Sequence, residues 1–205
     1  MGQLLSTRRD LIPPEVLQQL VLLQDRVKPF GSDVAKMRIQ ESLKADVNTL
    51  FARFDEQPLA AASIAQVHTA ALHDGREVVV KVTRPAIRSQ ILQDFEILEW
   101  LGDFLEKRLE AARALHLSEI IELDLTLEAD NTRRMRHYFT GSSMMYVPEV
   151  YMDSKDVMVA ERITGVPISD IETFEKLGMD RKDLAEKGLT IFFTQVFRDN
   201  FFHAD

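Results

Sequence analysis

Two strand-like runs on either side of Asp74 and Gly75 constrain the fold more than any other feature of this sequence. Residues 66–72 and 77–82 carry β-branched and apolar side chains that strands favour, and an Asp-Gly pair is typical of a tight hairpin turn. The second run places Lys81 among four valines. We therefore predict an antiparallel β-hairpin with a single lysine on its second strand.

Helical patterns surround this hairpin, and a second pair of strands follows it. Ser32 or Asp33 is the expected cap of the second helix, and Asp180 of the last. The expected helices cover residues 16–27, 33–43, 47–54, 87–105, 118–138, 170–177 and 181–197, and the further strands cover residues 144–151 and 157–163. This order of elements predicts an α+β fold with two lobes.

The same order divides the chain into three parts. We expect an N-terminal helical extension over residues 1–57, a lobe with a small sheet and a hinge over residues 58–165, and the first helices of a second lobe over residues 166–205. The last helix has an apolar stripe that should face a core in the second lobe, formed by Leu184, Leu189, Phe192, Phe193, Val196 and Phe197. Part of this stripe should be bare, because the second lobe is incomplete at Asp205.

The composition excludes several kinds of site and partner. The 205-residue chain has a net charge of -8, which argues against a nucleic-acid partner because a phosphate backbone is normally bound by a basic face. It has no cysteine, so disulfides, thiolate metal sites and cysteine nucleophiles are excluded. No apolar run reaches the roughly 18 residues of a membrane span, and the start lacks the charge order of a signal peptide. A soluble, acidic, globular chain is expected.

The hairpin lysine and the small residues before it are the first candidates for a binding site. In protein kinases a lysine at this place on a strand binds the α- and β-phosphates of ATP, and a glutamate on a helix orients it. The run Ala60, Ala61, Ala62 and Ser63 lets a backbone approach phosphates closely, although alanine resists the positive φ that glycine allows. The alternatives are a surface lysine on an ordinary strand, and a small-residue run that begins a helix or makes a packing contact.

Acidic residues further along the chain offer partners for Lys81. Glu122, Asp124 and Glu128 fall on one predicted helix, and the last two share a face because they are four residues apart. One of the three could pair with Lys81, or all could belong to a solvated acidic face. The final residues, His203-Ala204-Asp205, differ by one residue from the His-Arg-Asp of a kinase catalytic loop, whose aspartate accepts the proton of the substrate hydroxyl.

In this order the motifs resemble those of the UbiB family of atypical kinases, and the resemblance extends over essentially the whole chain. The run from Pro58 to His68 resembles the alanine-rich nucleotide loop of the family, and Lys81 lies where the family has its strand lysine. Residues 159–165, which include Glu161, resemble the hinge whose backbone groups hold the adenine. The other matching positions are Gly2 and Gln3 of a Lys-x-Gly-Gln motif, Glu122 and Asp124 of a Glu-x-Asp motif, Glu128 as the partner of the lysine, and Asp205 of the catalytic loop.

The resemblance implies a protein-kinase-like N-lobe, followed by a truncated C-lobe, in an enzyme that binds ATP with Mg²⁺ and supports ubiquinone biosynthesis. Lys81 and Asp205 would be its catalytic residues, and the nucleotide would be bound by Ala60, Ala61, Ala62, Ser63, Lys81, Glu128 and Glu161. The implied partners are an isoprenoid lipid or quinone precursor and quinone-biosynthesis proteins, at the cytoplasmic side of the bacterial inner membrane. Membrane association and the metal ligands belong to a region beyond Asp205, so we expect this chain alone to hold no metal and to be inactive.

The sequence departs from the family pattern at two places within the chain. The lysine of the Lys-x-Gly-Gln motif would precede Met1, so Met1 would be internal and a superficial myristoylation match at Gly2 would have no meaning. The predicted helix before Glu122 is shorter than in the family by about two turns at 3.6 residues per turn. Such a deletion bears on whether Glu128 is aimed at Lys81.

Three functions are open at this point: an ATP-dependent kinase or ATPase, a non-catalytic nucleotide- or lipid-binding module that regulates a biosynthetic complex, and an ordinary protein kinase. The alanine-rich loop and Ala204 argue against the ordinary kinase. For the enzyme, the two hairpins should share one antiparallel sheet with the helix over residues 118–138 beside it. The charged atoms of Lys81 and Glu128 should lie within about 4 Å of each other.

Overall fold

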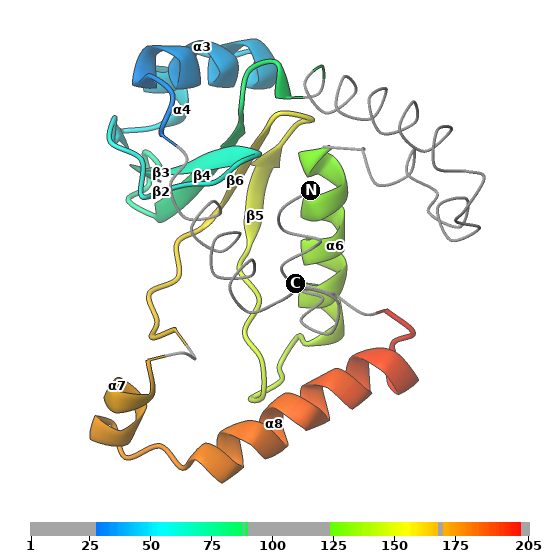
Figure 1. The fold of residues 1–205 in the computed structure, drawn as a ribbon. Helices are drawn as coiled ribbons and strands as arrows, with labels where there is room; N and C mark the ends of the chain where they lie inside the picture. The colour runs from blue at the N-terminus through cyan, green and yellow to red at the C-terminus, as the bar shows by residue number, and fades with distance from the viewer. Residues whose placement is uncertain (1–27, 88, 90–123, 168–169, 202–205) are drawn as a thin grey trace, which may run out of the picture.

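The computed structural model describes residues 28–87, 89, 124–167 and 170–201 (Figure 1). An antiparallel sheet and three helices form one part of it, and three further helical segments follow at the C-terminal end. The helix predicted over residues 16–27 falls outside the described residues. Of the helix predicted over residues 87–105, only residues 87 and 89 are described.

Six strands form one antiparallel sheet in the order β1-β3-β4-β6-β5, and β2 also pairs with β3. The strands are β1 (Arg53–Phe54), β2 (Ala60–Ala61), β3 (Ala65–Ala71), β4 (Glu77–Thr83), β5 (Val150–Asp153) and β6 (Val157–Glu161). Strands β3 and β4 are the predicted hairpin, and β4 pairs with β6 of the second hairpin. The predicted α+β fold, in which both hairpins share one sheet, is confirmed.

One face of this sheet is covered by helix α3 (Ser32–Leu43), and the contact forms the main core. Alternate residues of a strand point to the same face, so every second residue of β4 and of β6 is buried here. The fully buried set consists of Val78, Val80 and Val82 of β4, Val157 and Val159 of β6, Ala70 of β3 and Ile39 of α3. Burial of a valine or isoleucine side chain contributes roughly 1.5–3 kcal/mol, so this core fixes the position of β4 and of the lysine that it carries.

The start of α3 differs from the prediction. The helix begins at Ser32 with Gly31 in the N-cap position, and no side chain caps it. The predicted cap by Ser32 or Asp33 is therefore wrong. Asp33 lies in the first turn instead, where a negative charge is favourable beside the positive end of the helix dipole.

The helix predicted over residues 47–54 is only one turn long, because the chain turns into the sheet. Helix α4 spans Val47–Leu50, and the N–H of Phe51 closes it on the carbonyl of Val47. The Ala52 N–H then donates to the Ala71 carbonyl at 2.8 Å, and β1 follows. Pairing with β3 thus overrides the local helical pattern, and this part of the predicted extension shares the core of the sheet.

Helix α6 (Leu125–Tyr138) packs beside β5 and β6, as predicted, but it begins later than expected. Asp124 has an extended backbone, with φ of -117° and ψ of 104°, and its carboxylate accepts the Thr126 N–H at 2.9 Å. Asp124 is therefore the N-cap of α6 and not a helical residue on the face of Glu128. Of the helix predicted over residues 118–138, the part from Leu125 onward is confirmed, and residues 118–123 lie outside the described residues.

The strand predicted over residues 144–151 begins later, at Val150. Pro148 has no N–H to donate to a ladder, and such residues are confined to edges and bulges. The Glu149 carbonyl still accepts the Glu161 N–H at 2.8 Å, and a bulge between Val150 and Met152 follows. The second hairpin therefore has a short outer strand.

Three helical segments close the described chain: α7 (Ile171–Lys176), α8 (Arg181–Phe193) and the π-helix η2 (Thr194–Arg198). The predicted cap of α8 is confirmed, since the Asp180 carboxylate accepts the Lys182 N–H at 2.8 Å. Part of the apolar stripe is bare, as expected; its most exposed members are Leu189, Phe192, Phe193 and Phe197. In the described ranges, no helix is both long and apolar enough to cross a membrane.

Candidate nucleotide-binding site

Lys81 of β4 and Glu128 of α6 form an ion pair between the sheet and the helix. The Nζ atom of Lys81 lies 2.7 Å from Oε1 and 2.6 Å from Oε2 of Glu128, so the predicted pair is confirmed. Lys81 alternates with the buried valines of β4, and its side chain therefore points to the face opposite α3. The two side chains are 31% and 37% exposed, so a ligand can reach both from solvent.

The first turn of α6 aims Glu128 at the lysine. The Leu125 N–H donates to the Lys155 carbonyl in the turn between β5 and β6 at 3.1 Å, which fixes the start of the helix to the sheet. Glu128 lies one turn further on, close to the positive end of the helix dipole, where its negative charge is favourable. Two residues that are 47 positions apart in sequence are thereby brought into contact.

A cavity of about 420 Å³ lies beside the ion pair, between the sheet and α6. Val79 and Ala160 are cross-strand partners in β4 and β6, and Met158 is the partner of Lys81. These three residues line the sheet side, and Glu128 lines the helix side. The volume is within the range of small-molecule sites, which are mostly apolar with a few polar groups. The cavity therefore suits a flat apolar ring next to a charged group.

The carboxylate of Glu161, at the end of β6, is held by the protein itself. The Tyr146 hydroxyl lies 2.7 Å from both of its oxygens, and the Glu149 N–H donates to one of them at 3.2 Å. The hydrogen bond from Tyr146 is the main reason that the pKa of Glu161 is below its ordinary value. Glu161 thus orients the segment from Tyr146 to Glu149 around Pro148, and its predicted contact with a nucleotide stays a prediction.

The alanine-rich run forms the tip of an antiparallel hairpin. Ala60 and Ala61 pair with Val67 and Gln66 of β3, and the Ala62 N–H closes the turn on the Ala65 carbonyl at 2.8 Å. None of the residues from 60 to 64 has a positive φ, as expected for a loop without glycine. The alternative that this run begins a helix is excluded, and the turn around Ser63 is exposed.

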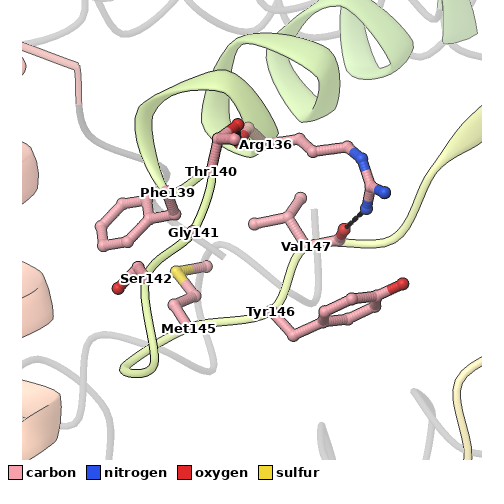
Figure 2. A pocket seen from close by; sticks show the side chains of 8 residues that line it. All are labelled: Arg136, Phe139, Thr140, Gly141, Ser142, Met145, Tyr146 and Val147. Atoms are coloured by element: carbon pink, nitrogen blue, oxygen red, sulfur yellow. Dashed lines mark hydrogen bonds between the residues drawn. The ribbon is translucent and has the colours of Figure 1, made fainter.

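A second cavity, of about 380 Å³, lies at the C-terminal end of α6 (Figure 2). Arg136 of α6 reaches across it, and its Nη1 atom donates to the Val147 carbonyl, while its guanidinium lies 5.5 Å from the centre of the Tyr146 ring. Met145 and Val147 line both this cavity and the larger one. Arg136 therefore holds the segment that forms the end wall of the candidate site.

The other predicted site residues are only partly described. Gly2, Gln3, Glu122 and Asp205 lie outside the described residues, and Asp124 caps α6 and lies 4.0 Å from Nζ of Lys155. The prediction missed the apolar walls of the cavity. Strand alternation counted from Lys81 would have identified Val79, but the residues of β6 could be assigned only once the pairing with β4 was known.

The sheet, the strand lysine paired with a helix glutamate and the adjoining cavity define the N-lobe of a protein-kinase-like protein. A comparison with known families identifies the family of this lobe. The model of the ABC1 atypical kinase-like domain matches residues 22–205. The match covers nearly all of the sequence, and the chain belongs to the ABC1 atypical kinase-like family.

Relatives named "Probable protein kinase UbiB" confirm the resemblance to UbiB proteins. Those of Pseudomonas entomophila (strain L48) and Aliivibrio fischeri (strain MJ11) are 50% identical over 215 residues and 49% identical over 216 residues. Each match covers 100% of this chain and 40% of the relative, so the chain spans two-fifths of their length. The aligned lengths exceed the 205 residues of the chain, so both alignments contain gaps in this chain. The deletion expected before Glu122 stays a prediction.

A solved structure gives the same fold. The Mycobacterium tuberculosis protein Rv3197, determined in complex with erythromycin, is 28% identical to this chain, and the two structures superpose with a TM-score of 0.63. The similarity covers 83% of this chain and 46% of that protein. The arrangement of the sheet and its helices is therefore shared with a relative of low sequence identity.

Proposed function

We propose that the chain forms the nucleotide-binding part of an ATP-dependent atypical kinase or ATPase that supports ubiquinone biosynthesis. The observation that carries the proposal is the Lys81–Glu128 ion pair beside the cavity along β4 and β6. Membership of the ABC1 family and the name of the relatives support the kinase class. The quinone pathway rests on the resemblance to the UbiB family.

In this proposal Lys81 binds the α- and β-phosphates. Glu128 holds the Nζ atom of Lys81 in place while no nucleotide is bound. A lysine side chain has four rotatable bonds, and an anchored ammonium loses less freedom when the phosphates arrive. The exposure of both side chains leaves room for the phosphates at the side of the pair. Lys81 therefore acts through its charge and its fixed position, which is how kinases stabilise phosphoryl transfer.

The remaining cofactor contacts come from three places. Adenine occupies the cavity against Val79 and Ala160, and it meets backbone groups of the hinge near Glu161. The loop of Ala60, Ala61, Ala62 and Ser63 covers the phosphates. Gly2, Gln3, Glu122 and Asp124 join the N-terminal extension to this site. The predicted parts then serve as extension (residues 1–57), nucleotide lobe (58–165) and start of the catalytic lobe (166–205).

Asp205 is the proposed catalytic base. It accepts the proton of the attacking hydroxyl or water while the bond between the γ-phosphorus and the bridging oxygen of ADP breaks and a new phosphorus–oxygen bond forms. Bound Mg²⁺ would neutralise phosphate charge. The described residues include no group of three or more His, Cys, Asp or Glu side chains placed to hold a metal, so no step is assigned to an ion held by them.

The proposed partners follow from the same resemblance. They are an isoprenoid lipid or quinone precursor and other quinone-biosynthesis proteins, met at the cytoplasmic side of the bacterial inner membrane. The membrane contact would use a region beyond the 205 residues, since the relatives are more than twice as long. Quinone precursors carry long apolar chains, and enzymes that act on them need access to the bilayer.

The test measures ATP binding and Mg²⁺-dependent ATP hydrolysis by the chain extended to the length of its relatives. We expect Lys81→Ala and Glu128→Ala to reduce hydrolysis by at least tenfold, because each removes a group that positions the phosphates. Lys182→Ala is the matched control, since Lys182 is a surface lysine in one ion pair with Glu186 at 3.8 Å. The 205-residue chain alone should not hydrolyse ATP.

Two outcomes would contradict the proposal. One is that the extended protein binds ATP tightly but does not hydrolyse it, and that an Asp205→Asn variant binds ATP equally tightly. This result would favour the regulatory nucleotide-binding module. Hydrolysis that survives Lys81→Ala would show that the ion pair is not part of an active site. Hydrolysis by the short chain at the rate of the extended one would refute the predicted inactivity of the short chain.

A further inference from the structure

Arg84, the residue that follows β4, contacts the alanine-rich hairpin twice. Its backbone N–H donates to the Ile64 carbonyl at 2.8 Å, and its side-chain Nε donates to the Ala62 carbonyl at 2.8 Å. Both carbonyls belong to the turn at the tip of the hairpin. The turn is therefore held from the side of β4 and not only by its pairing with β3.

The same guanidinium contacts a third segment, the residues just before α3. Nη2 of Arg84 donates to the Lys28 carbonyl at 3.0 Å, and the guanidinium lies 5.6 Å from the centre of the Phe30 ring. Arginine can make these contacts at once because its donors have a fixed planar arrangement. Burial lowers the pKa of Arg84, in agreement with a guanidinium that has exchanged water for carbonyl groups.

The segment that Arg84 contacts is itself fixed to the sheet. The Phe30 N–H donates to Oε1 of Gln66 at 3.1 Å, and Nε2 of Gln66 donates to the Phe30 carbonyl at 3.4 Å. Gln66 belongs to β3 and is fully buried, so this double contact is screened from water. Arg84 thus joins the tip of the hairpin to a part of the N-terminal chain that cannot easily move.

We propose that Arg84 is a positioning residue of the nucleotide site. It holds the turn at residues 62–64 in the one placement that lets the N–H groups of Ser63 and Ile64 meet a phosphate chain, since the Ala62 N–H is bonded to the Ala65 carbonyl. The inference rests on the proposed function and extends it, because it makes phosphate binding depend on the segment around Phe30. The physical reason is that the exposed turn has few internal contacts. Without Arg84 the turn would sample several conformations, and binding would have to restrict it again.

The proposal separates phosphate affinity from base affinity. Arg84 contacts the turn that is proposed to cover the phosphates, and it is not one of the residues that line the cavity beside Val79, Met158 and Ala160. Loss of Arg84 should therefore weaken the binding of a ligand that carries phosphates and leave the binding of a nucleoside unchanged. A merely structural role would weaken both ligands together, since unfolding or loosening of the sheet removes the whole site.

The experiment measures the dissociation constants of ADP and of adenosine by calorimetry, on the chain extended to the length of its relatives. The variants are Arg84→Ala and Arg84→Lys, and the control is Arg76→Ala, at the opposite end of the β3–β4 hairpin and paired with Asp74 at 2.6 Å. Hydrogen exchange of residues 60–65 is measured on the same samples without ligand. Added guanidinium at millimolar concentration tests chemical rescue of Arg84→Ala.

We expect Arg84→Ala to weaken the binding of ADP by at least fivefold and that of adenosine by less than twofold. Hydrogen exchange in residues 62–64 should be faster, and added guanidinium should restore part of the affinity for ADP. Arg84→Lys keeps one donor and should lie between the wild type and Arg84→Ala, which covers the case that Arg84→Ala does not fold. Arg76→Ala should match the wild type. An equal loss for ADP and adenosine, or unchanged exchange, overturns the inference. Wild-type protein that binds neither ligand would instead refute the proposed function, and the inference with it.

Discussion

Removing Lys81 and Glu128 singly and together measures how much their ion pair stabilises the fold. Lys81→Ala, Glu128→Ala and the double variant form a double-mutant cycle, which isolates the pairwise energy. Contacts of 2.6 and 2.7 Å are short, and hydrogen bonds to charged groups contribute about 1.5–3 kcal/mol. Both side chains are about one-third exposed, however, and screening by solvent reduces exposed pairs to about 0–1 kcal/mol. We therefore expect a coupling energy of about 1 kcal/mol.

The assay is urea denaturation followed by circular dichroism, with the free energy of unfolding compared at equal m-values. The Lys36–Glu56 pair is the control, because its atoms are also 2.6 Å apart but its side chains are 39% and 66% exposed. Its coupling energy should be a few tenths of a kcal/mol. If the Lys81–Glu128 coupling does not exceed that of the control pair, the pair does not fix the lysine, and packing of β4 alone positions it.

Three further predictions concern α6, Glu161 and His68. Asp124→Ala removes the acceptor of the Thr126 N–H at 2.9 Å and should lower the free energy of unfolding by about 1 kcal/mol in urea denaturation, whereas Asp124→Asn should retain most of it. Tyr146→Phe removes the main cause of the lowered pKa of Glu161. In an NMR titration the pKa of Glu161 should rise toward its ordinary value. In the wild type this lowered pKa contributes stability above pH 4.5 that is lost as the pH falls, and this contribution should be smaller in Tyr146→Phe. Burial lowers the pKa of His68 below 6.5, so only the unfolded chain takes up a proton at this residue just below that pH, and stability should fall as the pH decreases through this window.

Each of these predictions has a result that would contradict it. Equal losses for Asp124→Ala and Asp124→Asn would show that the carboxylate does not act as a cap. A Glu161 pKa that does not move in Tyr146→Phe would assign the shift to another neighbour. For His68, an NMR pKa at or above 6.5 would show that the contacts with Asp55, which raise the pKa, outweigh burial, and the predicted loss of stability would be absent.

The local parts of this fold could be predicted from the sequence. The Asp-Gly turn and the runs of β-branched and apolar residues identified the β3–β4 hairpin, because turn type and strand propensity depend on neighbouring residues. The cap of α8 by Asp180 was identified in the same way. The pairing of Lys81 with Glu128 was expected only through the family resemblance, since no local pattern relates residues that are 47 positions apart.

The errors have two causes, a distant contact that competes with a local preference and a local side-chain bond that competes with the helix. Residues 47–54 have a helical pattern, but pairing of Arg53 and Phe54 with β3 ends the helix at Leu50. At the start of α6, the side chain of Asp124 bonds to the backbone of Thr126, and this local alternative to the helix decides the boundary. The contacts of Arg84 could not be predicted, because they join three segments of the chain that only the folded sheet brings together.

The place of β4 between β3 and β6 has a consequence during synthesis on the ribosome. β3 is complete before β4 emerges, so the hairpin can form at once, but Val82 pairs with Val157, which emerges much later. Until then one edge of β4 is unpaired, and a run of valines at an open edge is a template for aggregation. Lys81 interrupts that run with a charge, as gatekeeper residues do. The residue proposed to hold phosphates in the folded protein would thus also protect the nascent chain.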